Sequence, residues 1–380
     1  MSATASLIRD VEAWAIRSSL PDMDVGGGVP VKVVMHSVVV KVTTEDGLHG
    51  WGDSWVQETD ARILLAGVKY GLRPLLLGQN ADHINRLWET QWRVARNHGL
   101  HPALSAVDIA LWDLKGRRLG APVSSLLGGR HHESVEAYAT LPWRKPKEEL
   151  TDMIRTAVAR GFKGAKVAIG HGVDADREFI AYVRGELPST HIAVDSNGRY
   201  NRSDAIRVGE ACDANGIRWF EEPVPYTDIY GLAEVNSRIR TPVSGFQFDT
   251  SVYAMRRMLA IDALSIYQPS LDKCGGITQA FKMAALADAW GRKLVPHSFS
   301  PALSFAASIH IAALAPTGGI MEFPVPEERP KDPGRYAFGE HLVDSRPLDV
   351  DSSGHVAVPT APGIGVEVNL ARVRELELPA

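Results

Sequence analysis

The sequence predicts an α/β protein in which a (β/α)8 barrel follows a smaller α+β domain. Its 380 residues exceed the length of a typical single domain, so one large unit and a smaller one are expected. Strand patterns and then long helical patterns occupy the N-terminal part of the chain. From about Val135, short apolar runs alternate with helical patterns, which is the order of a barrel built from βα units.

The N-terminal part contains a β-hairpin signal followed by helices. In HSVVVKVTTEDGLHGWGDS, Asp46 and Gly47 form a turn dipeptide between two strand-like runs. Helical patterns then extend from about Asp60 to Leu119. Strands that precede helices in this way predict an α+β domain.

The rest of the chain contains eight apolar runs, each followed by a polar or glycine-containing turn and then a helical pattern. Eight strand signals that alternate with helices predict the barrel. The runs are VEAYATL, GAKVAIG, HIAVDSN, IRWFEEP, TPVSGF, ALSIYQP, KLVPHS and GGIMEF.

Polar residues recur at the ends of these runs, 23 to 29 residues apart, which is about one βα unit. Barrel chemistry sits at the C-terminal ends of the strands, so these side chains are expected to converge on one mouth. For any single position, the alternative is a helix N-cap that follows a buried strand. The positions are Lys166, Asp195, Glu221, Gln247, Ser270, His297 and Glu322.

This ring of residues has the composition of a metal-assisted proton-transfer site. Asp195 and Glu221 can supply oxygen ligands for an ion such as Mg²⁺. Gln247 stands where a third ligand is expected, but an amide brings no charge, so the metal should bind more weakly than to three carboxylates. His297 and Lys166 can move protons if their pKa values are tuned. A metal between them would stabilise an enediolate formed by removing a proton α to a carboxylate.

Composition and charge point to a small-molecule partner. A net charge of −4 argues against nucleic acid or an anionic membrane as the main partner. The N-terminus, MSATASLIRDVEAW, is charged where a signal peptide needs an apolar core, and the longest apolar run is too short to span a bilayer. The two cysteines, Cys212 and Cys274, support neither a disulfide framework nor a cysteine-rich metal site. We therefore expect a cytoplasmic protein.

Several motifs give the chain a resemblance to the enolase superfamily, in its mandelate racemase-like branch. The motifs occur in the family's order, and the resemblance covers nearly the whole chain. They are HPALSAVDIALWDLKGRRLGAPVSSLLGG, VDSNGRY, WFEEPV, YQPSLDKCGGIT and VPHSFSP. The resemblance implies a capping domain built from both termini and a modified (β/α)8 barrel of the TIM type, whose last strand pairs differently. The expected division is a capping domain over 1–125, the barrel over 126–330, and a segment over 331–380 that returns to the capping domain.

The resemblance also assigns roles to individual residues. Asp195 and Glu221 match metal ligands, His297 matches a catalytic histidine, and Glu322 matches a carboxylate near the developing enediolate. Lys166 matches the first lysine of the family's Lys-x-Lys pair. The implied cofactor is Mg²⁺ and the implied chemistry is proton abstraction from a carboxylate substrate.

Three positions depart from the family's pattern. Ala168 stands where the second lysine, usually the base, is expected, and Gln247 replaces the third acidic ligand. Ser270 replaces the aspartate that orients the histidine. Asp249 and Asp272 each lie two residues after a missing acid, so they are candidates for a relocated metal ligand and histidine partner. The alternative for both is a helix cap or a surface charge.

Two hypotheses follow from these departures. In the first, His297 is the sole acid/base, and a sugar acid undergoes dehydration or cycloisomerisation rather than two-base racemisation or epimerisation. In the second, the barrel has lost catalysis and serves as a binding or structural protein. Asn197, Arg144 and Ser270 are candidate substrate-binding residues, although a surface arginine is the alternative at position 144. The resemblance implies a homo-oligomer, a dimer or an octamer.

Overall fold

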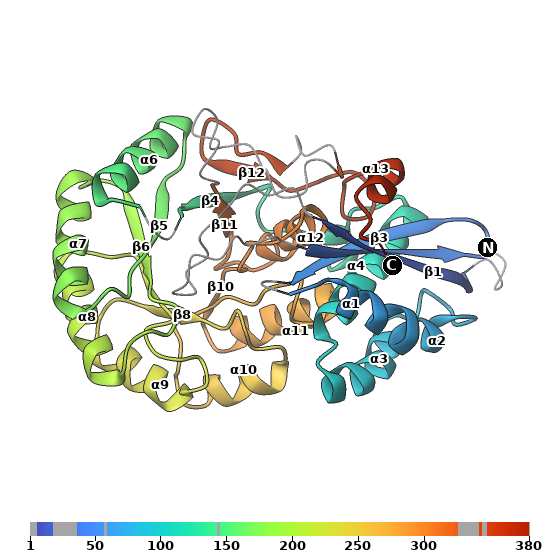
Figure 1. Cartoon of the computed structure of the whole chain (residues 1–380), viewed down its shortest axis with the longest axis horizontal. Helices are drawn as coiled ribbons and strands as arrows, with labels where there is room; N and C mark the ends of the chain where they lie inside the picture. The colour runs from blue at the N-terminus through green and yellow to red at the C-terminus, as the bar shows by residue number, and fades with distance from the viewer. Residues whose placement is uncertain are drawn as a thin grey trace.

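The protein consists of a barrel flanked by a smaller domain that contains a three-stranded sheet (Figure 1). The structure is a computed structural model, and it describes residues 6–17, 36–56, 59–142, 145–325, 342–343 and 348–379. Within these ranges, no helix combines the length and the apolar character needed to cross a membrane.

The small domain is built on an antiparallel sheet of β1 (Ile8–Arg17), β2 (His36–Thr44) and β3 (His49–Val56). The predicted turn lies between β2 and β3, where Gly47 has a φ of 83°. Alternate residues of β2 enter two different cores, because side chains of a strand point to opposite faces. Val38, Val40 and Val42 pack with the helices of this domain, whereas Val39 belongs to the core that includes the barrel.

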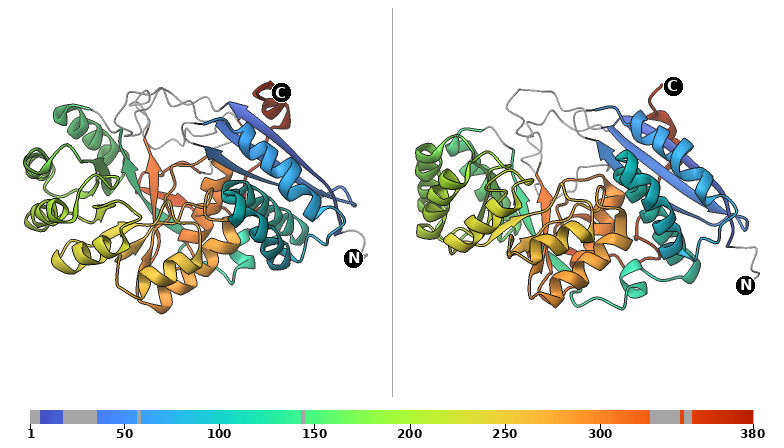
Figure 2. Two further views of the ribbon diagram at one scale, coloured as in Figure 1. Left: turned by 60° about the horizontal axis from the view of Figure 1, so that its bottom comes forward. Right: turned by 90° about the horizontal axis from the view of Figure 1, so that it is seen from below.

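Helices cover one face of this sheet (Figure 2). The longest of them packs closely against β3, since a Cβ atom on Gly52 would lie only 2.1 Å from the carbonyl oxygen of Ala106. The strand therefore requires glycine at this position. The helical elements are α1 (Arg62–Ala66), the π-helix η1 (Gly67–Leu72), α2 (Arg73–Leu76), α3 (Ile84–His98) and α4 (His101–Leu119).

All eight predicted barrel strands are present. Consecutive strands from β4 to β10 pair in parallel. The strands are β4 (Ser134–Thr140), β5 (Gly164–Ala168), β6 (His191–Asp195), β7 (Phe220–Glu221), β8 (Val243–Gly245), β9 (Ile266–Tyr267), β10 (Lys293–Leu294) and β11 (Ile320–Pro324).

Helices alternate with these strands, as the sequence predicts, and α6 to α10 form the outer layer in Figure 1. They are α5 (Val123–Leu126), α6 (Lys147–Arg160), α7 (Val173–Glu186), α8 (Arg202–Ala214), α9 (Ile229–Arg238), α10 (Val252–Leu259), α11 (Gly276–Ala289) and α12 (Ala302–Ala312).

The last barrel strand, β11, pairs in parallel with β4, and no ladder joins it to β10 within the described residues. On the same strand β4, β12 (His355–Ala357) adds an antiparallel pairing. The chain then reaches α13 (Leu370–Glu375), whose end contacts the small domain through a hydrogen bond of 3.0 Å from Arg17 N to Leu376 O. This sheet, with the small domain against it, is a modified (β/α)8 barrel with a capping domain.

The expected domain boundaries stay predictions. The boundary after residue 125 falls within α5, and the boundary after residue 330 lies outside the described residues.

Candidate functional site

The strand-end residues of the barrel come together at one edge of the sheet. Asp195 and Glu221 are the last residues of β6 and β7 and are partners in the register of the two strands. Lys166 lies on β5, and Glu322 lies on β11 at the other side of β4. Because all these strands are parallel, their C-terminal ends point to the same mouth.

The helices that follow these strands are capped by other residues. The N-cap side chains of α8, α9 and α10 are Asn201, Asp228 and Ser251, and each accepts a hydrogen bond from a backbone N–H of its own helix. Asp195 and Glu221 are therefore not the N-caps of the helices that follow them, and the simplest alternative to a functional role does not apply.

Lys166 lies at the centre of a buried cluster of carboxylates. Its Nζ is 2.7 Å from Glu221 Oε1, 2.9 Å from Glu322 Oε1 and 3.3 Å from Asp195 Oδ2. Burial alone would lower the pKa of Lys166, but these three carboxylates hold it well above its usual value. Lys166 is thus a permanent cation at neutral pH and cannot act as a general base there.

Glu322 is the anion that connects this cluster to His297. It accepts hydrogen bonds from Thr140 Oγ1 at 2.7 Å and from Ser298 N at 2.9 Å. Burial would raise the pKa of Glu322, but Lys166 and His297 outweigh it, and the pKa is lowered to about 2. The carboxylate is therefore ionised and fixed in place.

Two acids of the cluster have raised pKa values. Burial raises the pKa of Glu221 to about 8 against the opposing effect of Lys166. Burial and the neighbouring carboxylates of Asp195 and Glu221 raise the pKa of Glu222 well above its usual value. One oxygen of Glu222, Oε1, is buried without a hydrogen-bond partner. Together with Asp195 and Glu322, these residues form a buried set of four acids that contains a single ammonium group, that of Lys166.

This surplus of buried acids over cations fits a divalent cation, which would favour the ionised forms of the acids. No three His, Cys, Asp or Glu side chains in the described ranges are grouped so that they could hold a metal ion. Asp195 and Glu221 would therefore need the amide oxygen of Gln247 beside them. The Nε2 of Gln247 donates to Glu222 Oε2 at 3.0 Å, which leaves its carbonyl oxygen for another partner. Two carboxylates supplemented by a neutral oxygen and water suit Mg²⁺.

Three residues beside this cluster have left-handed backbone conformations. Asn197, Glu222 and Phe246 have φ values of 50°, 43° and 98°, and each follows the end of β6, β7 or β8 by one or two residues. Such conformations are costly for residues other than glycine and are concentrated at functional sites. Glu222 is not among the residues predicted from the sequence, although the doubled acid in WFEEPV is a signal for it.

His297 is buried beside β9 and makes contacts through both ring nitrogens. Its Nδ1 lies 3.1 Å from Ser270 Oγ, and its Nε2 lies 3.7 Å from Glu322 Oε2. Burial lowers the pKa of His297 to about 3, with Glu322 opposing the shift and Lys273 and Lys166 adding to it. The imidazole is neutral at neutral pH, the protonation state that a general base requires.

Ser270 also binds Asp272, because its hydroxyl donates to Asp272 Oδ1. The acid that the sequence lacks at position 270 is therefore two residues away and reaches the histidine through a hydroxyl. Asp249, in contrast, is half-buried in the loop before α10, and burial raises its pKa to about 6 against the charge of Arg257. Its role as a relocated metal ligand stays a prediction.

Of the other residues predicted to belong to the site, two lie close to the charged cluster. Ala168 ends β5 and shares a face with Lys166, so no second basic group stands there. Asn197 is exposed, and its N–H donates to Asp195 Oδ1 at 2.8 Å. Arg144 lies outside the described residues. Lys273, which was not a candidate, lies over the rings of Trp55 at 4.9 Å and Phe248 at 5.8 Å.

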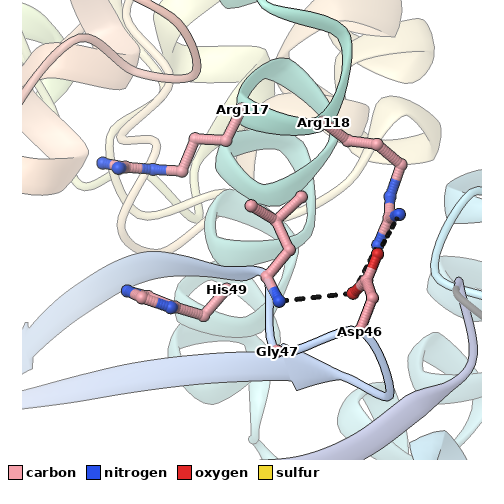
Figure 3. A pocket seen from close by; sticks show the side chains of 6 residues that line it. Asp46, Gly47, His49, Arg117 and Arg118 are labelled. Atoms are coloured by element: carbon pink, nitrogen blue, oxygen red, sulfur yellow. Dashed lines mark hydrogen bonds and ion pairs between the residues drawn. The ribbon is translucent and has the colours of Figure 1, made fainter.

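A hollow of about 550 Å³ on the capping domain is separate from this set of residues (Figure 3). It is lined by the turn after β2 and by the end of α4. Arg118 pairs with Asp46 at 2.7 Å, and Arg117 pairs with Asp113 and Glu367 at 2.8 Å each. These arginines stabilise the turn and the chain beside it, so the hollow is not the candidate site.

The chain is similar to known proteins over most of its length. Residues 28–128 match the mandelate racemase/muconate lactonizing enzyme N-terminal domain, and residues 149–372 match the enolase C-terminal domain-like family. D-galactarolactone cycloisomerase of Agrobacterium fabrum is 33% identical over 359 residues, which cover 90% of this chain and 91% of that protein.

Solved structures that are similar over 98% of the chain include the following two. One is the 3,6-anhydro-D-galactonate cycloisomerase of Zobellia galactanivorans, with a TM-score of 0.82, 30% identity and 100% of that chain covered. The other is the L-talarate dehydratase of a Polaromonas species, in complex with magnesium and L-glucarate, with a TM-score of 0.84, 25% identity and 98% of that chain covered.

Proposed function

The chain belongs to the mandelate racemase-like branch of the enolase superfamily, and on that premise we propose that it removes a proton α to the carboxylate of a sugar acid. Dehydration or cycloisomerisation is the proposed outcome. The observation that carries the proposal is the neutral, buried His297 beside the charged cluster of Lys166 and Glu322 at the strand ends. The substrates in the names of the relatives support a sugar acid.

Each residue of the cluster has a role that follows from its charge. His297 takes the α-proton at Nε2 and returns it as an acid to the leaving group or to the product. Lys166 stays protonated and stabilises the negative charge that develops on the substrate carboxylate. Glu322 holds Lys166 in place and, when His297 is protonated, stabilises the imidazolium. Because position 168 is alanine, no lysine stands beside Lys166 to serve a second face of the substrate, so two-base racemisation is disfavoured.

Asp195, Glu221 and Gln247 are the residues that would hold Mg²⁺. When bound, the ion would supply charge stabilisation for the carboxylate oxygens of the substrate. The surplus of buried acids and the magnesium in the talarate dehydratase structure support this assignment. Glu222 would hold the amide of Gln247 in orientation, as outer groups commonly do for metal ligands.

The test is turnover of a panel of five- and six-carbon sugar acids and their lactones, with product detection by NMR. We expect Mg²⁺-dependent conversion that is lost in His297→Asn. His310→Asn is the matched control, because His310 is another buried histidine, and its ring nitrogens contact the backbone of Ser124 and Ile364 rather than the charged cluster. This control should retain the activity per folded molecule.

The other outcomes of the same panel decide against the proposal. If calorimetry detects binding of a sugar acid that the protein does not convert, the second hypothesis is favoured, in which the barrel binds ligands without catalysis. A product that differs from the substrate only in its configuration at the α-carbon would identify a racemase or epimerase instead.

A further inference from the structure

The loop after β9 carries a buried hydrogen-bonded chain from His297 through Ser270 to Asp272. The backbones of Ser270 and His297 form a parallel bridge, and His297 N donates to Pro269 O at 3.2 Å. Lys273 N and Cys274 N both donate to Ser270 O, at 3.0 and 2.8 Å, so the loop turns back on itself. This turn brings the carboxylate of Asp272 onto the hydroxyl of Ser270.

From this arrangement we infer that Asp272 and Ser270 are positioning residues that fix the tautomer of His297, with the proton on Nδ1 and an unprotonated Nε2. The inference rests on the proposed function for its catalytic meaning, whereas the tautomer is a property of the resting protein.

The direction of the hydrogen bonds follows from counting hydrogens. An ionised carboxylate only accepts, and a serine hydroxyl has a single hydrogen to donate. The hydrogen of Ser270 is given to Asp272 Oδ1, so Ser270 Oγ must accept at its other contact, 3.1 Å from His297 Nδ1. The donor there is the N–H of His297, and Nε2 is left with its lone pair.

Glu322 is the group that competes for the proton of His297. An ionised Glu322 would favour a proton on Nε2, but its Oε2 lies 3.7 Å away, beyond hydrogen-bonding distance. The contact with Ser270 is 0.6 Å shorter and within that distance. The hydrogen bond therefore decides the tautomer, and the lone pair of Nε2 lies on the side of Glu322.

The capping domain also contacts Asp272. Its carbonyl oxygen accepts from Ser54 Oγ at 2.7 Å, a contact supplied by β3 of the capping domain. Burial raises the pKa of Asp272, while Lys273, Ser270, its own backbone N–H and Trp55 oppose that shift. The capping domain and the barrel thus both contribute to the acid end of the chain.

Ser270 and Asp272 together thus take the place of an aspartate bonded directly to the histidine. A neutral His297 can accept the substrate proton only at a free nitrogen, and the chain keeps that nitrogen at Nε2. Once protonated, the ring still donates from Nδ1 to Ser270 Oγ. The carboxylate of Asp272, bonded to the same hydroxyl, is then the nearby negative charge on that side of the ring. Removal of the acid that orients a catalytic histidine costs up to about 10⁴-fold in turnover in other enzymes, because the wrong tautomer is populated.

The experiment is a two-bond ¹H–¹⁵N correlation spectrum of the full-length protein, labelled at its 13 histidines, at neutral pH. The signals of His297 are assigned by their loss in His297→Gln. We expect the shifts of a neutral ring protonated at Nδ1. Ser270→Ala and Asp272→Asn should each lose this pattern in favour of a proton on Nε2, and Ser270→Thr, which keeps the hydroxyl, should retain it.

Ser308→Ala is the matched control, because it removes another fully buried hydroxyl, hydrogen-bonded to Ser304 O at 2.8 Å, and should leave His297 unchanged. A wild-type His297 protonated at Nε2, or a spectrum of Ser270→Ala identical to that of the wild type, would overturn the inference. The expected tautomer in a protein that converts no acid would support the inference and contradict the proposed function. Where turnover is found, Asp272→Asn should lower kcat by about 10²-fold or more, and Ser308→Ala should not.

Discussion

The replacement of Lys166 by methionine tests the charge balance of the site. The ammonium group of Lys166 is buried and lies within 3.3 Å of three carboxylates, those of Asp195, Glu221 and Glu322. Methionine has a similar length and no charge. The substitution would therefore leave the acids of the cluster without their cation, and both stability and metal binding should respond.

The expected loss of stability is large. Removal of one partner of a buried ion pair costs about 3–5 kcal/mol, because the remaining charge stays buried and uncompensated. An ion pair between exposed side chains contributes much less to stability, about 0–1 kcal/mol. Lys293→Met, which replaces an exposed lysine of β10, is the matched control and should change the free energy of unfolding by about 0.5 kcal/mol at most.

Urea unfolding with and without Mg²⁺ measures both effects. Mg²⁺ should stabilise Lys166→Met more than the wild type, because the ion then supplies the missing positive charge. A ligand at 100 times its Kd stabilises by about 2.7 kcal/mol, so much of the lost stability should return. A variant as stable as the wild type without Mg²⁺ would refute the assignment of Lys166 as the cation that balances the cluster.

Three further predictions concern the histidine, the metal and the capping domain. The pKa of His297 is about 3, against an ordinary value of 6.5, so the NMR shifts of its ring should not change between pH 5 and 8. The free energy of unfolding of the wild type should fall as the pH decreases from about 6.5 to about 3, because the unfolded chain binds the proton first. A titration midpoint of the ring near 6.5 would contradict this prediction. Gln247→Glu should lower the Kd for Mg²⁺, measured by calorimetry, at least about tenfold, because it adds a charged ligand. Gln79→Glu, at an exposed position, is the control and should leave the Kd unchanged. Equal Kd values for Gln247→Glu and the wild type would exclude position 247 as a ligand. Asp53→Ala should lower the free energy of unfolding in urea by about 2–3 kcal/mol. The reason is that the buried Asp53 accepts hydrogen bonds from Leu303 N and from Ser304 N and Oγ at the start of α12. A loss no larger than that of Asp152→Ala, which replaces an exposed aspartate, would refute this role.

The sequence was sufficient to predict the barrel because its signals are local and repeated. Each strand is a short apolar run followed by a turn, and the Asp46–Gly47 hairpin has its own turn chemistry. The convergence of Lys166, Asp195 and Glu221 follows from the topology, since the ends of parallel strands meet at one edge. That inference required no knowledge of side-chain conformations.

The contacts within the site could not be predicted in the same way. Whether Asp272 reaches a histidine depends on the turn after β9 and on the single hydrogen of Ser270, and neither leaves a periodic signal in the sequence. Glu222 was missed because a second acid after a strand end has the appearance of a solvent-exposed residue, whereas here its backbone turns left-handed and keeps it buried. The support that Asp53 and Ser54 give to the barrel depends on how the two domains pack.

We propose that His297, rather than a residue at position 168, transfers the α-proton. Incorporation of solvent deuterium at the α-carbon, followed by NMR with Mg²⁺ and a sugar acid that the protein converts, tests this most directly. We predict incorporation or α-proton loss in the wild type and in His310→Asn, and none in His297→Asn. Exchange that persists at the wild-type rate in His297→Asn would contradict the claim.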